Sequence, residues 1–212
     1  GHSVTDKHAP ILDFDPAIAA IIEPQELHPA IEGLPHRCVI TWMGDAFSQF
    51  ENSHDVTERH RFTLETVVNP IYEFDVEGEK ILVTMANVGA PAAAALFEAL
   101  IAIGCTDFVA IGSSGGLVPE LPPGTVVVPD AAIRDEGVSY HYAPASLMAY
   151  PDPGMQTTVH DAYQAAGNRV ARGIAWTTDA FYRETSAKVA QRVAQGAIAV
   201  DMELASLAAI AS

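Results

Sequence analysis

The chain of 212 residues is poor in cysteine and has no long apolar run. Its two cysteines, Cys38 and Cys105, lie in apolar sequence without Cys-x-x-Cys spacing, which argues against a disulfide framework and a thiolate metal site. Two buried free thiols are expected instead. The apolar runs stay below the roughly 18 residues that a membrane-spanning helix needs, so no membrane partner is expected. No secretory signal is recognisable, and the cytoplasm is the expected compartment.

Positive charge is also scarce. The 11 lysines and arginines are outnumbered by 27 aspartates and glutamates, which gives a net charge of −16 at neutral pH. Such a field repels nucleic acid polymers and anionic lipid surfaces, so neither is an expected partner. A small anion would have to be held by a few local donors, for which the arginine fork is well suited.

Apolar strands alternate with helical segments along most of the chain, which predicts an α/β protein. Residues 1–36 carry five prolines and little periodicity, so we expect an N-terminal arm there. Residues 37–212 are expected to form a single α/β domain. Helices are predicted over residues 92–103, 156–171 and 186–195. Strands are predicted over residues 125–128, 173–177 and 197–200, and a β-hairpin over residues 71–85.

A continuous apolar run, Phe108 to Ile111, breaks abruptly into glycines and hydroxyls at Gly112 to Gly116. The run is typical of a strand buried on both faces, and the glycines let the backbone approach a ligand closely. Ser113 and Ser114 would then lie at the carboxyl end of that strand, where open α/β sheets usually bind ligands. A plain strand-to-loop turn explains the same pattern.

A second strand ends in the same manner. Cys38 to Met43 is apolar and stops at Gly44, so its loop is expected to face the same crevice. Asp45 is then a helix cap or a site carboxylate. His54 and His60 are six residues apart, which does not match the i, i+4 spacing of a helical zinc pair, and no metal site is expected.

Two polar stretches further along have open interpretations. Residues 134–142 are too polar for a core position by composition, and His141 within them is interpreted as a rim residue. Glu203 interrupts an apolar run where a strand meets a helix. It is either a first-turn acid favoured by the helix dipole or a carboxylate that accepts hydrogen bonds from the vicinal hydroxyls of a sugar.

Four segments, in this order and spacing, together resemble the nucleoside phosphorylase and nucleosidase superfamily, most closely its uridine phosphorylase-like branch. The segments are Ile111 to Gly116, Pro123 to Pro129 running into Arg134 to His141, Thr177 to Tyr182, and Val200 to Glu203.

The resemblance implies a three-layer α/β/α sandwich with a central mixed, partly barrel-like sheet. It implies cleavage of the N-glycosidic bond of a nucleoside by phosphate, giving free base and ribose 1-phosphate. Phosphate would be the co-substrate, no cofactor or metal would be needed, and the assembly would be a homodimer or a hexamer built from dimers. The family continues beyond the position of Ser212 with a strand, an acid-bearing loop and a helix, so the chain is expected to lack these and the acid is not assigned.

The resemblance also implies roles for individual residues. Glu203 and Ser113 correspond to the catalytic positions, Glu203 on the ribose hydroxyls and Ser113 on phosphate. The matched binding positions are Gly44 at the phosphate, Ser114 and Gly115 beside the base, Phe181 against the nucleoside, Met202 at the ribose, and His28, which would reach into a neighbouring subunit's site.

The phosphate-binding arginines of the family have no match here. Their places hold Ala110, about Ser48 and a position near Val67. Substitutes could come from Arg59, Arg61, Arg134 or Arg183. Two alternatives therefore stay open: a hydrolytic nucleosidase that uses water, and a non-catalytic nucleoside-binding protein.

Overall fold

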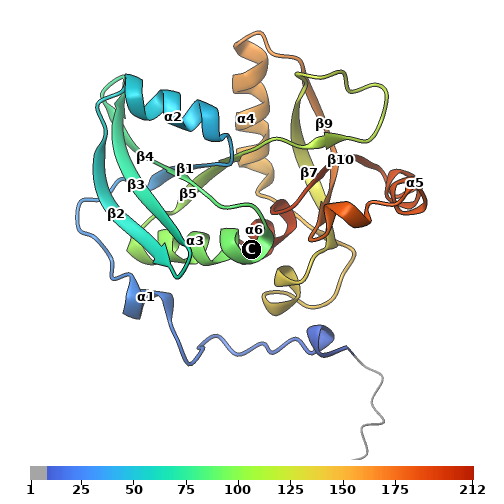
Figure 1. Ribbon diagram of the computed structural model, residues 1–212, viewed down its shortest axis with the longest axis horizontal. Helices are drawn as coiled ribbons and strands as arrows, with labels where there is room; N and C mark the ends of the chain where they lie inside the picture. The colour runs from blue at the N-terminus through green and yellow to red at the C-terminus, as the bar shows by residue number, and fades with distance from the viewer. Residues whose placement is uncertain (1–8) are drawn as a thin grey trace, which may run out of the picture. The chain divides into compact units, whose positions relative to one another are not determined.

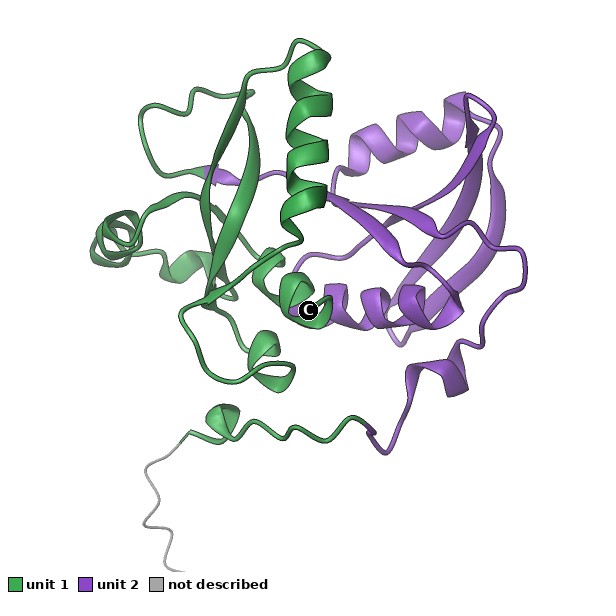
Figure 2. Cartoon of the chain, turned by 180° about the vertical axis from the view of Figure 1, so that it is seen from behind, with its two compact units in different colours: residues 1–18, 116–212 green, residues 19–115 purple. Residues whose placement is uncertain are grey.

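The computed structural model describes residues 9–212, which form two compact units (Figure 2). Unit 2 is residues 19–115, and the described part of unit 1 is residues 9–18 and 116–212. Each unit contains one five-stranded sheet of mixed direction. The described part of the predicted arm, residues 9–36, is largely exposed and carries two short helices, η1 (Pro10–Leu12) and α1 (Pro24–Leu27). Residues 1–8 of that arm lie outside the described residues.

The sheet of unit 2 has the strand order β2-β3-β4-β1-β5. Its strands are β1 (Arg37–Thr41), β2 (Thr57–Leu64), β3 (Val67–Val76), β4 (Glu79–Met85) and β5 (Asp107–Ile111). β3 and β4 form the predicted antiparallel hairpin, whose turn uses positive φ at Glu77 (55°) and Gly78 (87°). β1 runs parallel to both β4 and β5.

Helices α2 (Gly44–Ser53) and α3 (Ala90–Ile103) cover opposite faces of this sheet (Figure 1). α3 is the predicted alanine-rich helix, and it ends at Gly104, whose φ of 122° is accessible mainly to glycine. α2 was not expected in its polar segment. Its apolar side consists of Phe47 and Phe50, whose rings lie against Tyr72 and Phe74 of β3.

The expectation that Phe108 to Ile111 is buried on both faces is wrong. β5 pairs with β1 on one side and is the edge strand of its sheet. Ala110 is exposed and its neighbours are half-buried. Phe108 packs edge-on against Phe97 of α3, with ring centroids 4.5 Å apart, so one face of the strand is covered by the helix.

The sheet of unit 1 has the order β6-β10-β9-β7-β8, with β7, β9 and β10 parallel. Its strands are β6 (Gly115–Gly116), β7 (Val126–Asp135), β8 (Met148–Ala149), β9 (Val170–Thr178) and β10 (Ala197–Asp201), and its helices are α4 (Pro153–Ala165), α5 (Ser186–Ala194) and α6 (Leu204–Ile210). α4 ends six residues before the predicted residue 171. The chain turns at Gly167, φ 83°, and residues from Val170 onward join β9.

The expectation that residues 134–142 are too polar for a core position is also wrong. Arg134, Glu136 and Ser139 are 5%, 6% and 0% exposed, so this segment contributes to the interior of unit 1 despite its polarity. Burial is tolerated because every one of these groups has hydrogen-bond partners. His141 is exposed, as expected for a rim residue.

Both cysteines are free and buried, which confirms the prediction of two unpaired thiols. A hydrogen bond from Cys105 and burial raise the pKa of Cys38 well above its usual range. The Cys38 thiol is therefore a protonated apolar side chain at neutral pH, whereas its hydrogen bond with Cys38 lowers the pKa of Cys105. Within residues 9–212, no helix is both long and apolar enough to cross a membrane.

The arm is joined to the sheet of unit 2 by a pair of histidines. His28 Nδ1 lies 3.0 Å from His60 Nε2 on β2, and the His28 ring packs on Phe62 with centroids 5.4 Å apart. Burial lowers the pKa of His28, and burial together with the charge of His28 lowers the pKa of His60. The hydrogen bond needs one neutral ring as acceptor, so double protonation breaks it.

This pair predicts a pH-dependent stability. Because the folded pKa values lie below the unfolded value of about 6.5, the unfolded chain binds more protons as pH falls below that value, and the pair's contribution to the free energy of unfolding is lost. Denaturant unfolding at a series of pH values from about 7.5 to 5 measures it. His60→Asn should reduce the slope, and His28→Asn added to it should reduce the slope further, because burial lowers the pKa of His28 by itself. A slope equal to the wild type's in both variants would contradict the assignment.

Candidate active site

The residues assigned from the resemblance fall into two groups, one on each unit. Unit 1 carries Phe181, Met202 and Glu203, and unit 2 carries His28, Gly44, Ser113, Ser114 and Gly115. All except His28 lie in segments that directly follow the carboxyl ends of parallel strands. In open α/β sheets, ligands bind beyond the carboxyl ends of the strands, and we call this end of each sheet its carboxyl edge.

In unit 1 the strand register aligns polar residues from three strands. Thr177 on β9 pairs with Arg134 on β7 and with Asp201 on β10. The loop after β9 carries Asp179 and the short helix η3 (Phe181–Arg183), and the loop after β10 carries Met202 and Glu203. Three strand ends therefore bring these side chains to one edge of the unit 1 sheet.

Glu203 stands at the N-cap of α6, but its side chain does not cap that helix. Asp201 does so instead: its Oδ2 accepts hydrogen bonds from the backbone N–H of Glu203 at 3.0 Å and of Leu204 at 2.6 Å. Thr177 donates to Asp201 Oδ1 at 2.7 Å and accepts from Ala205 N–H at 3.0 Å. The first turn of α6 is thus satisfied by the ends of β9 and β10.

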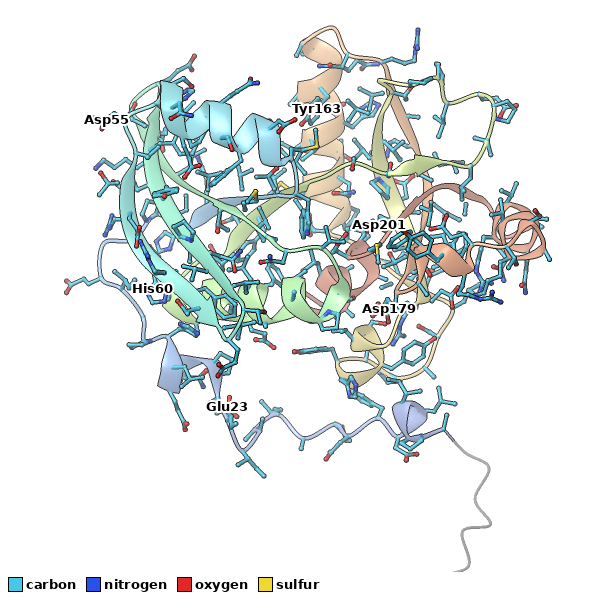
Figure 3. The ribbon with its side chains drawn as sticks, viewed as in Figure 1. Glu23, Asp55, His60, Tyr163, Asp179 and Asp201 are labelled. Carbon is cyan, nitrogen blue, oxygen red and sulfur yellow. The ribbon has the colours of Figure 1, made fainter. Side chains whose placement is uncertain are left out.

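This edge of unit 1 is acidic; Figure 3 labels two of its carboxylates, Asp179 and Asp201. Burial raises the pKa of Asp201, although hydrogen bonds from Thr177 and two backbone amides oppose the shift. Burial and the charges of Glu136 and Asp135 raise the pKa of Asp179, against a hydrogen bond from Gly137 N–H at 2.8 Å. A concentration of carboxylates suits hydroxyl donors and repels anions.

Two of the cations near this edge, Arg192 and Lys188, are bound to Asp135. Asp135 accepts from Arg192 and from Trp176 Nε1, each at 3.0 Å, and lies 3.3 Å from Lys188. Burial raises the pKa of Asp135, but the hydrogen bonds from Arg192 and Trp176 outweigh it and leave the pKa lowered. Asp135 therefore serves to fix α5 against β7 and β9.

Two aromatic rings project from η3. The rings of Phe181 and Tyr182 have centroids 4.1 Å apart, and the residues are 51% and 88% exposed. Exposed aromatic rings offer flat apolar surface for a planar ligand. Arg183 follows directly and is exposed as well.

In unit 2 the ends of β1, β4 and β5 are bound to one another. Trp42 N–H donates to Ile111 O at 3.0 Å, and the Trp42 indole donates to Asn87 O at 3.0 Å. Gly44 begins α2 directly after β1, and Ser113 and the exposed residues beside it follow β5. The two predicted loops therefore start at the same edge, as expected.

The arginines suggested as phosphate ligands are mostly engaged elsewhere. Arg59 is paired with Glu73, and Arg61 donates twice to Glu58 at 2.8 and 2.7 Å. Arg134 is buried and donates to Ser139 and to groups of residues 143–146. Its assignment as a phosphate ligand is therefore not supported by its contacts, and Arg183 is the exposed candidate of the four.

Two residues at the carboxyl ends of the unit 1 strands were not predicted to contribute to the candidate site. Thr177 and Asp201 lie within the quoted segments, but no role was assigned to them. Their signal is positional, since each is the polar end of an apolar strand. No group of three or more histidine, cysteine, aspartate or glutamate side chains able to hold a metal ion occurs among residues 9–212.

Comparisons with known proteins agree with the resemblance. The chain is 33% identical to a uridine phosphorylase of Treponema pallidum over 143 residues, which is 62% of this chain and 55% of that protein. It is 34% identical to a uridine phosphorylase of Thermococcus kodakarensis over 106 residues, covering 50% of this chain and 38% of that protein. A guanosine phosphorylase of Halorubrum lacusprofundi is 28% identical over 145 residues, covering 68% and 58%. The chain spans about half the length of the curated relatives it matches.

The fold is that of a solved relative. The crystal structure of uridine phosphorylase from Vibrio fischeri ES114 matches with a TM-score of 0.76 at 19% identity, covering 90% of this chain and 79% of that one. The predicted α/β class, a three-layer sandwich of the nucleoside phosphorylase type, is confirmed by this likeness. The profile of the phosphorylase superfamily matches residues 18–212, and the chain belongs to that family.

Proposed function

We propose that the protein is a nucleoside phosphorylase, a pentosyltransferase that cleaves the N-glycosidic bond of a nucleoside with phosphate. The observation that carries the proposal is the acidic edge of unit 1, where Glu203 follows Asp201 at the start of α6 and Phe181 follows β9. Family membership supplies the reaction class, and the uridine phosphorylases among the relatives support phosphorolysis.

The chemistry assigns a task to each group. The transition state resembles a ribosyl cation, so a carboxylate on the ribose hydroxyls stabilises the developing positive charge. Glu203 has that role, with Met202 beside the ribose and Phe181 against the nucleoside. Ser113 and Gly44 of unit 2 contact the phosphate nucleophile, and Ser114 and Gly115 contact the base.

The base is a pyrimidine or a purine, since relatives named as uridine phosphorylases and as a guanosine phosphorylase both match. Arg183 is the exposed donor next to the aromatic pair and is available to a base carbonyl or to an anion. Phosphate is the co-substrate, and no cofactor is used. We place the protein in the cytoplasm as a homodimer or a hexamer of dimers, in which His28 serves a neighbouring subunit.

Base release from a panel of uridine, thymidine, inosine and guanosine, with and without phosphate, tests the proposal. The expected result is release that requires phosphate and yields an equal amount of ribose 1-phosphate, or of 2-deoxyribose 1-phosphate from thymidine. Release at the same rate without phosphate would establish hydrolysis, and nucleoside binding without turnover would establish a binding protein. Either outcome rejects the proposed activity.

A further inference from the structure

Glu203 is held in place by a hydrogen-bonded pair that the resemblance does not assign. Thr177 is completely buried at the end of β9, and its hydroxyl donates to Asp201 Oδ1 at 2.7 Å. The hydroxyl oxygen of Thr177 also accepts a hydrogen bond from Ala205 N–H at 3.0 Å. A single hydroxyl thus joins the end of β9, the end of β10 and the first turn of α6.

Asp201 completes the connection through its other oxygen. Oδ2 accepts from the backbone N–H of both Glu203 and Leu204. Three backbone amides at the start of α6, those of residues 203–205, are therefore held by two side chains from strand ends. The Met202–Glu203 peptide has little freedom to rotate, because its own N–H is one of these donors.

The arrangement also determines what caps α6. A carboxylate at an N-cap normally accepts from the second or third amide of its own helix. Here Asp201 accepts from the first amide, that of Leu204, and Thr177 from the second, that of Ala205, while Glu203 makes no side-chain capping bond. Asp201 and Thr177 therefore cap α6, and the Glu203 carboxylate takes no part in capping it.

We propose that Thr177 and Asp201 form a positioning pair that orients Glu203 toward the ribose hydroxyls. Thr177 does not itself contact the nucleoside; it acts through Asp201 and the α6 backbone. The inference rests on the proposed function, in which Glu203 is the ribose ligand.

The test is a double-mutant cycle in the full chain between Thr177 and Glu203, with phosphorolysis as the readout. Thr177→Val keeps the branched shape but removes the hydroxyl, and should raise KM for the nucleoside about tenfold, the effect of about one hydrogen bond. KM for phosphate should stay unchanged. Thr177→Ser keeps the hydroxyl and should restore the wild-type KM. In a Glu203→Ala background, Thr177→Val should have no further effect, because the group that it positions is gone.

If Thr177→Val weakened phosphorolysis equally in the presence and absence of Glu203, the proposed positioning pair would be rejected, since Thr177 would then have a general structural role. A folded Thr177→Val variant with wild-type kinetics would overturn it as well. Failure of the proposed function is seen separately, in the wild type. A wild-type chain that binds nucleosides without turnover rejects the activity, and the same cycle is then measured as nucleoside affinity by calorimetry. A wild-type chain that binds no nucleoside overturns both.

Discussion

Replacing Glu203 with alanine is expected to reduce base release about 10²- to 10³-fold, the usual cost of removing one group that stabilises transition-state charge. Hydrogen bonds to an ionised carboxylate are about twice as strong as neutral ones, and they strengthen as the sugar gains positive charge. The loss should therefore appear in kcat as well as in kcat/KM. Glu203→Gln, which keeps an acceptor but removes the charge, should fall between the wild type and the alanine variant.

The fold should survive this substitution. The amides of α6 are held by Asp201 and Thr177, and Glu203 contributes no side-chain cap. The interaction of its carboxylate with the helix dipole, which the substitution removes, is worth about 0.3–1 kcal/mol. Chemical denaturation checks this, and Glu120→Ala, which removes an exposed acid of the same unit, is the matched control with unchanged activity and stability. A Glu203→Ala variant with full activity would reject the assignment of Glu203.

Local sequence patterns predicted the regular elements well where apolar residues recur at the period of the element. The hairpin of β3 and β4, helices α3 and α5, and the strands β9 and β10 belong to this group. Helix α2 was missed because only Phe47 and Phe50 mark its apolar side within a polar segment. β2 was missed for a similar reason: it is an edge strand with mostly polar side chains, as edge strands often are.

The strand ends that carry the candidate residues were predictable, but the contacts among those residues were not. Glycines and an acid after apolar runs predicted that Ser113 and Glu203 lie just beyond strand ends, and the structure places them after β5 and β10. Their roles in a site stay predictions. Which carboxylate caps α6 depends on the register of β9 against β10, which places Asp201 opposite Thr177. That register joins residues 24 positions apart and leaves no local signal.

The burial of residues 134–142 was mispredicted for the same physical reason. Composition assigns arginine and glutamate to the surface, since such residues are almost never buried unless paired. Glu136 here accepts from Ser206 at 2.9 Å, 70 residues further along the chain, and from Ser139 N–H at 2.9 Å. Only the folded chain supplies those partners, so composition alone could not reveal them.

Replacing Arg134 with methionine should destabilise unit 1 by about 1–3 kcal/mol, the cost of leaving a buried hydrogen-bond acceptor without its donor. Arg134 Nε donates to Ser139 Oγ at 2.8 Å, and Nη1 donates to Ser146 Oγ and to Pro144 O. The hydroxyl of Ser139 also donates to Glu136, so loss of the guanidinium removes a donor from a buried network that includes this carboxylate. Methionine fills much of the volume but supplies none of these donors.

The choice of variants separates this structural role from phosphate binding. Arg134→Lys keeps the charge but cannot reproduce the planar fork, and should recover only part of the lost stability. Arg172→Met is the matched control, because its pair with Asp130 is partly exposed and surface ion pairs contribute about 0–1 kcal/mol. Denaturant unfolding measures all three variants, and KM for phosphate is measured on each that folds. If Arg134 bound phosphate, Arg134→Met would fold normally and raise only that KM. Its guanidinium is instead bound by residues 139–146 of its own unit, which predicts loss of stability first.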